Sequence, residues 1–219
     1  MSHALPTHHL PDELLMQYAA GAESEPVSLF IATHLALCPR CRGIVQEHER
    51  VGGVLFDRHD PAELAPGALD AILGSLDEQE VEVPKPPEPL GFEPLFPEPL
   101  RSYVGPAHAL KWRMLVPGVQ KIEIGLGTPP LTARLLRFKP GFRPPLHTHD
   151  GAERTLVLAG GYTDDEGHFG PGDVAIRYGD KDHDQKFDEG EPCVGLFVND
   201  GPLVPRTWLG KILSVITGA

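Results

Sequence analysis

The sequence has no long apolar run and little cysteine. No stretch approaches the roughly 18 to 20 apolar residues that a membrane-spanning helix needs. The segment from Met1 to Asp12 has neither a basic start nor an apolar core, so it does not read as a secretory signal. These absences predict a cytoplasmic protein without membrane contact, in a compartment where thiols stay reduced.

Only three cysteines occur among the 219 residues, and Cys38 and Cys41 form a C-x-x-C pair. An odd number with this spacing argues against a disulfide framework and leaves a metal site or a redox pair. A redox pair of the thioredoxin type needs a strand before the motif, and no such strand is predicted here. The third cysteine, Cys193, is isolated and is expected to be a buried apolar residue.

Lysine is absent from residues 1–83, where 14 acidic side chains face only four arginines, a local formal charge of −10 within a total of −12. Contacts with nucleic-acid phosphates require lysine and arginine, so direct DNA binding is disfavoured. An acidic field of this kind favours a basic protein partner, although simple solubility would also account for it.

The composition changes near residue 84, where a proline-rich segment begins. Eight prolines lie between Pro84 and Pro106. Because proline lacks an amide donor and fixes φ, we expect a linker over 84–106 that forms neither a helix nor a central strand. Four apolar side chains of this linker are candidates for docking on a neighbour: Leu90, Phe92, Leu95 and Phe96. The chain is thus divided into residues 1–83, the linker, and residues 107–219.

Residues 1–83 are predicted to form four helices, an all-α bundle. The first has Pro11, Asp12 and Glu13 as its first turn and stops near Gly21, and the second follows an N-cap at Ser24. Pro39 opens the third helix, which runs to about Phe56, and Pro66 opens the fourth. The fourth helix carries an apolar stripe at helical spacing, made of Leu69, Ile72, Leu73 and Leu76.

Residues 107–219 show short apolar runs separated by glycine turns, which predict an antiparallel barrel or sandwich. The expected strands are Arg113–Val116, Val119–Ile124, Thr132–Phe138, Arg154–Leu158, Asp173–Tyr178 and Val194–Val198. The oligomeric state cannot be inferred from these patterns.

A first set of metal-binding side chains lies in the helical part, with the pattern H-x-x-x-C-x-x-C at His34, Cys38 and Cys41. On a helix, residues four apart share one face. A structural Zn²⁺ site needs four ligands in a tetrahedron. Either His8 or His9 could supply the fourth, and His9 is preferred. The alternative is that His34 is only a packed core residue.

A second set follows in the strand-rich part. From Gly141 to Gly160 the sequence reads G-x5-H-x-H-x3-E-x6-G, with His147, His149 and Glu153 at the polar positions. Residues two apart in a strand point to the same side, here the interior of a barrel. Glu153 starts the next strand after a turn and can meet both histidines at one metal ion.

This pattern resembles the first motif of the cupin family. The second cupin motif is present in part: Gly172 and His183 match, whereas Tyr178, Asp180 and Phe187 stand where proline, glycine and asparagine are usual. The resemblance implies an all-β jelly-roll barrel with a metal held by His147, His149, Glu153 and His183. Such a set suits Zn²⁺, iron, manganese or nickel. A barrel without metal is the alternative, although unpaired interior polar groups are costly.

Three helical segments, LLMQYAAG, HLALCPRC and PGALDAILGSLDE, resemble the zinc-containing anti-sigma domain. That domain followed by a cupin resembles the ChrR family of transcriptional regulators over nearly the whole chain. The resemblance implies a non-enzymatic protein that inhibits a sigma factor of the extracytoplasmic-function class. It also implies release of that factor under singlet-oxygen stress, sensed by the cupin. The structural zinc would be held by His9, His34, Cys38 and Cys41.

A different class of function is also compatible with the motifs. Cupin metal sites with an open position catalyse oxygen chemistry, so a dioxygenase or isomerase with a zinc-stabilised appendage is the alternative. The charge of −10 in residues 1–83 favours the regulator, because a mere appendage has no need of a concentrated acidic field.

Overall fold

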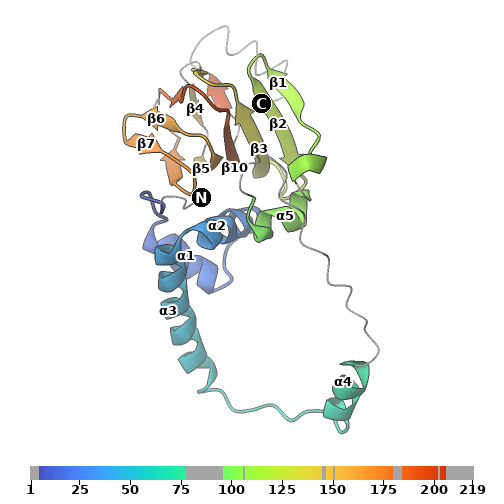
Figure 1. Ribbon diagram of the computed structural model, residues 1–219. Helices are drawn as coiled ribbons and strands as arrows, with labels where there is room; N and C mark the ends of the chain where they lie inside the picture. The colour runs from blue at the N-terminus through green and yellow to red at the C-terminus, as the bar shows by residue number, and fades with distance from the viewer. Residues whose placement is uncertain are drawn as a thin grey trace.

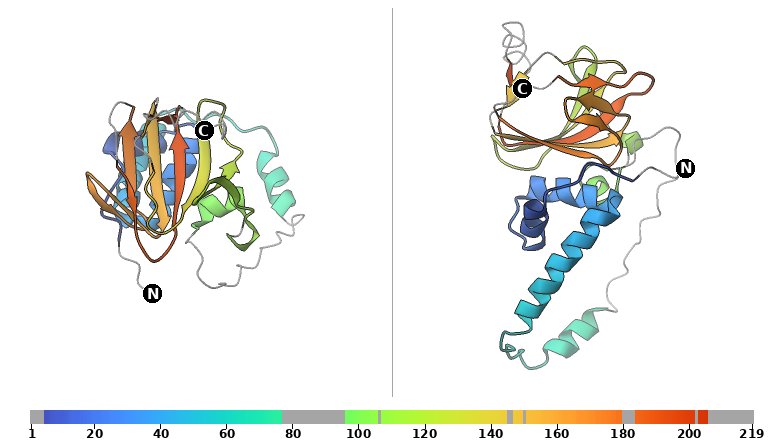
Figure 2. Two further views of the ribbon diagram at one scale, coloured as in Figure 1. Left: turned by 90° about the horizontal axis from the view of Figure 1, so that it is seen from above. Right: turned by 90° about the vertical axis from the view of Figure 1, so that its left-hand side faces the viewer.

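The computed structural model describes residues 5–76, 96–105, 107–144, 147–149, 151–179, 184–201 and 203–205. Within them, helices come first and strands follow, and the sheets lie on top of a layer of helices (Figures 1 and 2). The helices are α1 (Asp12–Ala19), α2 (Glu25–Leu37), α3 (Pro39–Phe56), α4 (Ala68–Leu76) and α5 (Glu98–Val104), with a short 3-10 turn η1 (Ala107–Ala109).

α1 begins at Asp12, one residue after the predicted Pro11, and the starts of α2 and α3 agree with the sequence prediction. Ser24 occupies the N-cap position of α2, with Pro26 in the first turn, although the serine side chain makes no capping hydrogen bond. Pro39 is the first residue of α3, where its missing amide hydrogen costs nothing. Among the helices described, none has the length and apolar character needed to cross a membrane.

The fourth predicted helix forms, but a four-helix bundle is not confirmed. α1 packs against α3 and α2, whereas α4 has no buried residue and stands apart from the other helices (Figure 1). All four apolar side chains of its stripe are more than half exposed. The amphipathic pattern therefore predicted the helix correctly, but this stripe has no partner within the described part of the chain.

The expectation that 84–106 contains no helix is wrong, because α5 lies within this segment. The prolines allow it: Pro97 is the N-cap and Pro99 lies in the first turn, where an amide donor is not needed. Leu100 is fully buried and α5 packs against α2. Phe96 is buried as predicted, and the three other docking candidates, Leu90, Phe92 and Leu95, lie outside the described residues.

The strands form three antiparallel sheets. The largest has the order β1-β2-β3-β10-β5-β8, and smaller sheets have the orders β7-β6-β9 and β11-β4. The bounds are β1 (Arg113–Val116), β2 (Val119–Ile124), β3 (Thr132–Phe138), β4 (His147–His149), β5 (Ala152–Ala159), β6 (Tyr162–Asp164), β7 (Gly167–Phe169), β8 (Val174–Tyr178), β9 (Lys186–Phe187), β10 (Cys193–Asn199) and β11 (Leu203–Pro205). All six predicted strands are present. Closure into a jelly-roll barrel is not confirmed.

The large sheet is covered on both faces, and the alternation along β10 shows how. Val194, Leu196 and Val198 join the apolar core that contains the helices. Cys193 and Phe197 point to the other side, into a second core with the aromatic residues of the smaller sheet, among them Tyr162. Cys193 is therefore buried, as predicted, and β10 reads as an almost continuous apolar run because neither of its faces meets water.

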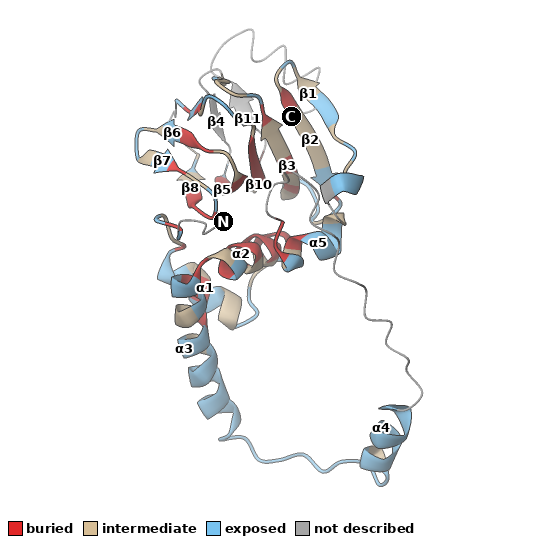
Figure 3. Cartoon of the chain, in the orientation of Figure 1, coloured by how far each residue is buried: buried red, intermediate tan, exposed pale blue. Residues whose placement is uncertain are grey.

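The helical part and the large sheet share one core instead of packing as two independent bodies. α2 contacts both β10 and β5, and the buried side chains of α2 and β10 belong to one apolar cluster (Figure 3). Most of α2 is buried, including Phe30 and Ile31, because one side of the helix meets the sheet while α3 and α5 pack elsewhere on it. The division of the chain into residues 1–83, 84–106 and 107–219 remains a prediction. Helix α2 of the first part is nevertheless in direct contact with β5 and β10 of the third part.

Candidate metal centre

The two cysteines of the candidate metal centre lie at the junction of α2 and α3. A residue before proline disfavours the helical conformation, and Cys38, which precedes Pro39, is extended at φ −113° and ψ 100°. This single residue ends α2 and starts α3 in a new direction. The Cys38 sulfur accepts a hydrogen bond from the Cys41 amide at 3.4 Å and so caps α3. Both sulfurs are thereby brought to one turn, beside His34 in the last turn of α2.

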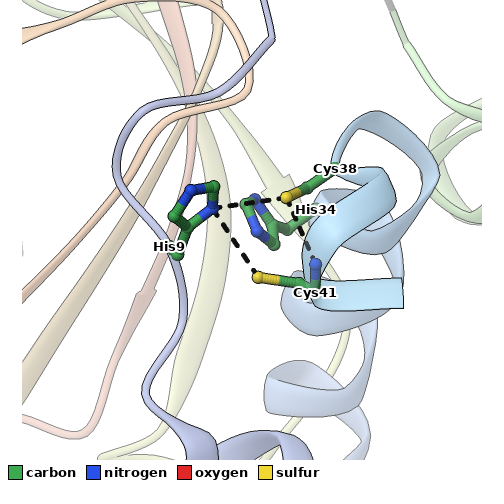
Figure 4. A group of neighbouring side chains, drawn as sticks. All are labelled: His9, His34, Cys38 and Cys41. Atoms are coloured by element: carbon green, nitrogen blue, oxygen red, sulfur yellow. Dashed lines mark hydrogen bonds between the residues drawn. The ribbon is translucent and has the colours of Figure 1, made fainter. Parts of the chain in front are cut away.

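Four potential ligands converge at this junction, as the sequence predicted: His9, His34, Cys38 and Cys41 (Figure 4). One ligand atom from each lies within 4.8 Å of all the others. His9 Nδ1 is 3.3 Å from the Cys38 sulfur and 3.8 Å from the Cys41 sulfur. A tetrahedral zinc ion with ordinary bond lengths separates its ligand atoms by about 3.3 to 3.8 Å. The cluster therefore fits a four-coordinate metal ion.

The choice between the two N-terminal histidines is decided by their contacts. His9 turns toward the sulfurs, whereas the ring of His8 stacks on Phe169 at 4.1 Å between centroids. His8 Nδ1 also lies 3.6 Å from an oxygen of Asp173. The geometry thus assigns His9, not His8, to the cluster.

Burial keeps the histidine of α2 neutral and its tautomer is fixed. His34 is fully buried, and burial lowers its pKa to about 4. Its Nδ1–H donates to the carbonyl oxygen of Gly172 at 2.9 Å, which leaves Nε2 as the ring nitrogen with a lone pair. That nitrogen is buried and finds no hydrogen-bond partner within the described part of the protein. A buried acceptor of this kind is costly unless a metal ion binds it.

The thiol of Cys41 is buried and loses its proton less readily than an exposed thiol. Burial raises its pKa to about 11, and the nearby Cys38 sulfur acts in the same direction. Burial is also the main cause that lowers the pKa of His9, followed by the charge of Arg40. At neutral pH these groups are uncharged, and a metal ion that binds Cys41 must displace its proton.

The second predicted ligand set is described only in part. The backbone of His147 and His149 forms β4, which pairs with β11, and His183 lies outside the described residues. Glu153 is buried on β5, where it pairs with Arg177 of β8 and Asn199 of β10. The strand positions agree with those expected for a cupin, whereas the convergence of the four side chains stays a prediction.

Sequence reasoning missed two residues beside the metal cluster. Gly172 is the last residue of a Gly-Pro-Gly turn and was identified only as a glycine of the second cupin motif, and Asp173 was identified only as the first residue of a strand. In the structure this turn contacts α2 through His34 and the N-terminal segment through Thr7 and His8. No local pattern could have revealed these contacts, because they join residues more than 130 positions apart.

Comparison with known proteins agrees with this arrangement. Residues 101–204 match the family model of the ChrR cupin-like domain. The chain is 37% identical over 208 residues to the anti-sigma-E factor ChrR of Cereibacter sphaeroides, covering 94% of this chain and 96% of that protein. The crystal structure of Rhodobacter sphaeroides SigE in complex with the anti-sigma ChrR matches with a TM-score of 0.71 and 35% identity, covering 88% of this chain and 98% of that chain. This protein therefore belongs to the ChrR family.

Proposed function

We propose that this protein is an anti-sigma factor, which binds a sigma factor of the extracytoplasmic-function class and keeps it from RNA polymerase. The observation that carries the proposal is that almost all of α4 and of the second half of α3 is exposed (Figure 3), although both carry large apolar side chains. We call these side chains the apolar stripes: Val51, Val54, Leu55 and Phe56 on α3, and Leu69, Ile72, Leu73 and Leu76 on α4, each more than half exposed. Apolar surface on this scale, outside any core, is typical of a protein-binding site.

The charge of the helical part supports the choice of partner. The four arginines of residues 1–83 are outnumbered by 14 acidic groups. A sigma factor carries basic surfaces that meet DNA, and an acidic protein with apolar stripes complements them. The related ChrR protein was crystallised in complex with SigE.

The metal cluster has a structural role in this proposal. His9, His34, Cys38 and Cys41 would hold Zn²⁺ with no open position, and an ion without a vacant position stabilises a fold instead of catalysing a reaction. The ion would tie the N-terminal segment to the junction of α2 and α3. We also assign α4 as the fourth helix of a bundle that is completed around the bound sigma factor.

The strand-rich part is assigned to sensing. We infer a jelly-roll cupin barrel in which His147, His149, Glu153 and His183 hold Zn²⁺ or another divalent metal such as iron, manganese or nickel. The motif spacing and the buried position of Glu153 on β5 support this assignment. Singlet oxygen reacts readily with histidine, so oxidation of a ligand would loosen the metal and favour the state that binds the sigma factor less well.

The cupin-enzyme alternative is weakened, because the curated relative that matches most of the chain is a regulator and not an enzyme. A sigma factor acts on cytoplasmic RNA polymerase, so we place the protein in the cytoplasm.

The proposal is tested with the full chain and a sigma factor of the extracytoplasmic-function class encoded in the same genome. We expect a stable complex in size-exclusion chromatography and loss of transcription from a promoter that depends on this sigma factor. If no candidate sigma factor binds, the anti-sigma assignment is wrong, and metal-loaded protein should then be assayed for oxygen consumption.

The sensing role makes a separate prediction. The double variant His147→Ala/His149→Ala is expected to lose one metal ion per chain, to retain the sigma complex, and to fail to release the sigma factor under singlet oxygen. Metal content is measured by elemental analysis, and release by transcription after illumination with a photosensitiser. His108→Ala is the matched control, because His108 lies in η1 and outside both ligand sets. Normal release by the double variant would contradict the sensing role of these histidines.

A further inference from the structure

The carboxylate of Asp173 lies between the large sheet and the N-terminal segment, where it is only 5% exposed. One of its oxygens accepts hydrogen bonds from the backbone amides of Thr7 at 2.6 Å and His8 at 2.8 Å. The other accepts from the amide of Gly170, in its own turn, at 2.9 Å. Burial alone would raise the pKa of Asp173, but these backbone hydrogen bonds outweigh it and the pKa is lowered. The carboxylate is therefore charged and acts as a multiple acceptor for the segment that carries His9.

The same turn is fixed firmly to the sheet. The amide of Gly172 donates to the carbonyl of Val157 on β5, and the amide of Val157 donates to the carbonyl of Asp173. On the other side, the amide of Val174 donates to the carbonyl of His8, although at 3.4 Å this bond is weak. The N-terminal segment thus donates hydrogen bonds to Asp173 and accepts one from Val174, the first residue of β8.

The turn also contacts the other histidine of the cluster. The carbonyl oxygen of Gly172 accepts the Nδ1–H of His34 and so directs Nε2 toward the sulfurs. Only glycine fits here: φ is +91°, and a Cβ atom would lie 2.6 Å from a side-chain carbon of Pro6. The close approach of the turn to the N-terminal segment therefore requires glycine at position 172.

From these contacts we infer that the Gly172–Asp173 turn of the large sheet is a part of the zinc site, holding His34 directly and His9 through the backbone of its neighbours. Neither residue touches the metal, so both are positioning residues. The inference rests on the proposed binding of a metal by the four-residue cluster. Outer hydrogen-bond partners of this kind typically change metal affinity by about 10- to 100-fold.

The inference has a thermodynamic consequence. If the turn raises the affinity of the cluster for its metal, then the metal strengthens the docking of the turn by the same factor. The turn opens β8, which pairs with β5, the strand of Glu153. The strand-rich part of the chain thus has a direct connection to the ion that stabilises the helical part.

The test uses Co²⁺ in the full-length protein, because absorption from sulfur-to-cobalt charge transfer reports only on sites with cysteine ligands and ignores a cupin site. Asp173→Asn keeps the shape of the side chain but removes its charge and one acceptor. We expect its Co²⁺ affinity at the cysteine site to fall at least 10-fold, with an unchanged circular dichroism spectrum.

A second variant guards against misfolding of the sheet. Thr7→Pro removes the shortest hydrogen bond to Asp173 from an exposed position of the N-terminal segment and leaves the turn intact. It should weaken Co²⁺ binding in the same direction. Two controls, Glu191→Gln and Asp60→Asn, each remove an exposed carboxylate and should leave the affinity within about twofold of that of the unmodified protein.

The outcomes separate the inference from the function on which it rests. A cysteine–cobalt band that Cys38→Ser abolishes, weakened in both Asp173→Asn and Thr7→Pro but not in the controls, supports the inference. The same band with equal affinity in all variants overturns the role of the turn and leaves the metal site intact. Absence of the band from the unmodified protein overturns the metal site itself, and the inference with it.

Discussion

Replacement of Cys41 by serine is expected to remove one zinc ion per chain, the ion proposed for the four-residue cluster, to unfold α1 and α3, and to abolish the sigma complex. Structural zinc sites contribute about 10 to 16 kcal/mol of apparent binding free energy in small domains, which equals or exceeds the whole stability of a typical domain. α2 shares its core with the large sheet and should persist, whereas the junction of α2 and α3 would lose the proposed ion.

Zinc content by elemental analysis, helical signal by circular dichroism and complex formation by chromatography check this result. Cys193→Ala is the matched control, because Cys193 is an equally buried cysteine in the other core, and it should keep zinc and the complex. A Cys41→Ser protein with full zinc content and an intact complex would contradict the structural role of the ion.

The second large effect concerns the apolar stripe of α4. The double variant Ile72→Glu/Leu73→Glu is expected to weaken the sigma complex at least 100-fold and to leave the stability of the free protein unchanged. Both side chains are exposed, at 61% and 52%, so charging them costs the free fold little. A buried apolar anchor at an interface is worth about 2 kcal/mol or more, and two anchors with unpaired charges exceed the 2.7 kcal/mol of a 100-fold change.

The matched control for this experiment lies on the same helix. Ala71 is exposed on the face of α4 away from the stripe, so Ala71→Glu adds a charge of the same sign and should change affinity by less than about threefold. Isothermal titration calorimetry measures affinity, and thermal unfolding measures stability. Equal affinities for the unmodified protein and the double variant would exclude α4 from the sigma-binding surface.

Local chemistry was sufficient to predict most of the elements but not their packing. Pro39 and the extended residue before it determine the end of α2 and the start of α3, and both follow from the fixed φ of proline. Helix α5 was missed because proline was counted over the whole segment, although only its position relative to the helix start matters. That α4 lies apart from the other described helices could not be predicted, because an amphipathic stripe shows that a helix has an apolar face and not what covers it.

The four residues of the metal cluster could be predicted from local sequence patterns, whereas the residues that surround the cluster could not. Ligand type and helical spacing identify three of its four members from one short stretch of sequence. His9 was chosen over His8 by preference, and the choice is decided by the contacts of His9 with the two sulfurs and of the His8 ring with Phe169 and Asp173. Gly172 and Asp173 come from a distant turn, and a single sequence carries no information on contacts of that range.

The core shared by α2 and β10 has a consequence for how the chain is made. The ribosome completes α2 at Leu37 about 156 residues before it adds Cys193, the first residue of β10. At roughly 5 to 20 residues per second, the sheet-facing side of α2 waits on the order of 10 to 30 seconds for its cover. During that interval the nascent helical part exposes an apolar surface that the finished protein hides. A messenger RNA that ends before β10 would therefore produce an aggregation-prone fragment instead of a minimal inhibitor.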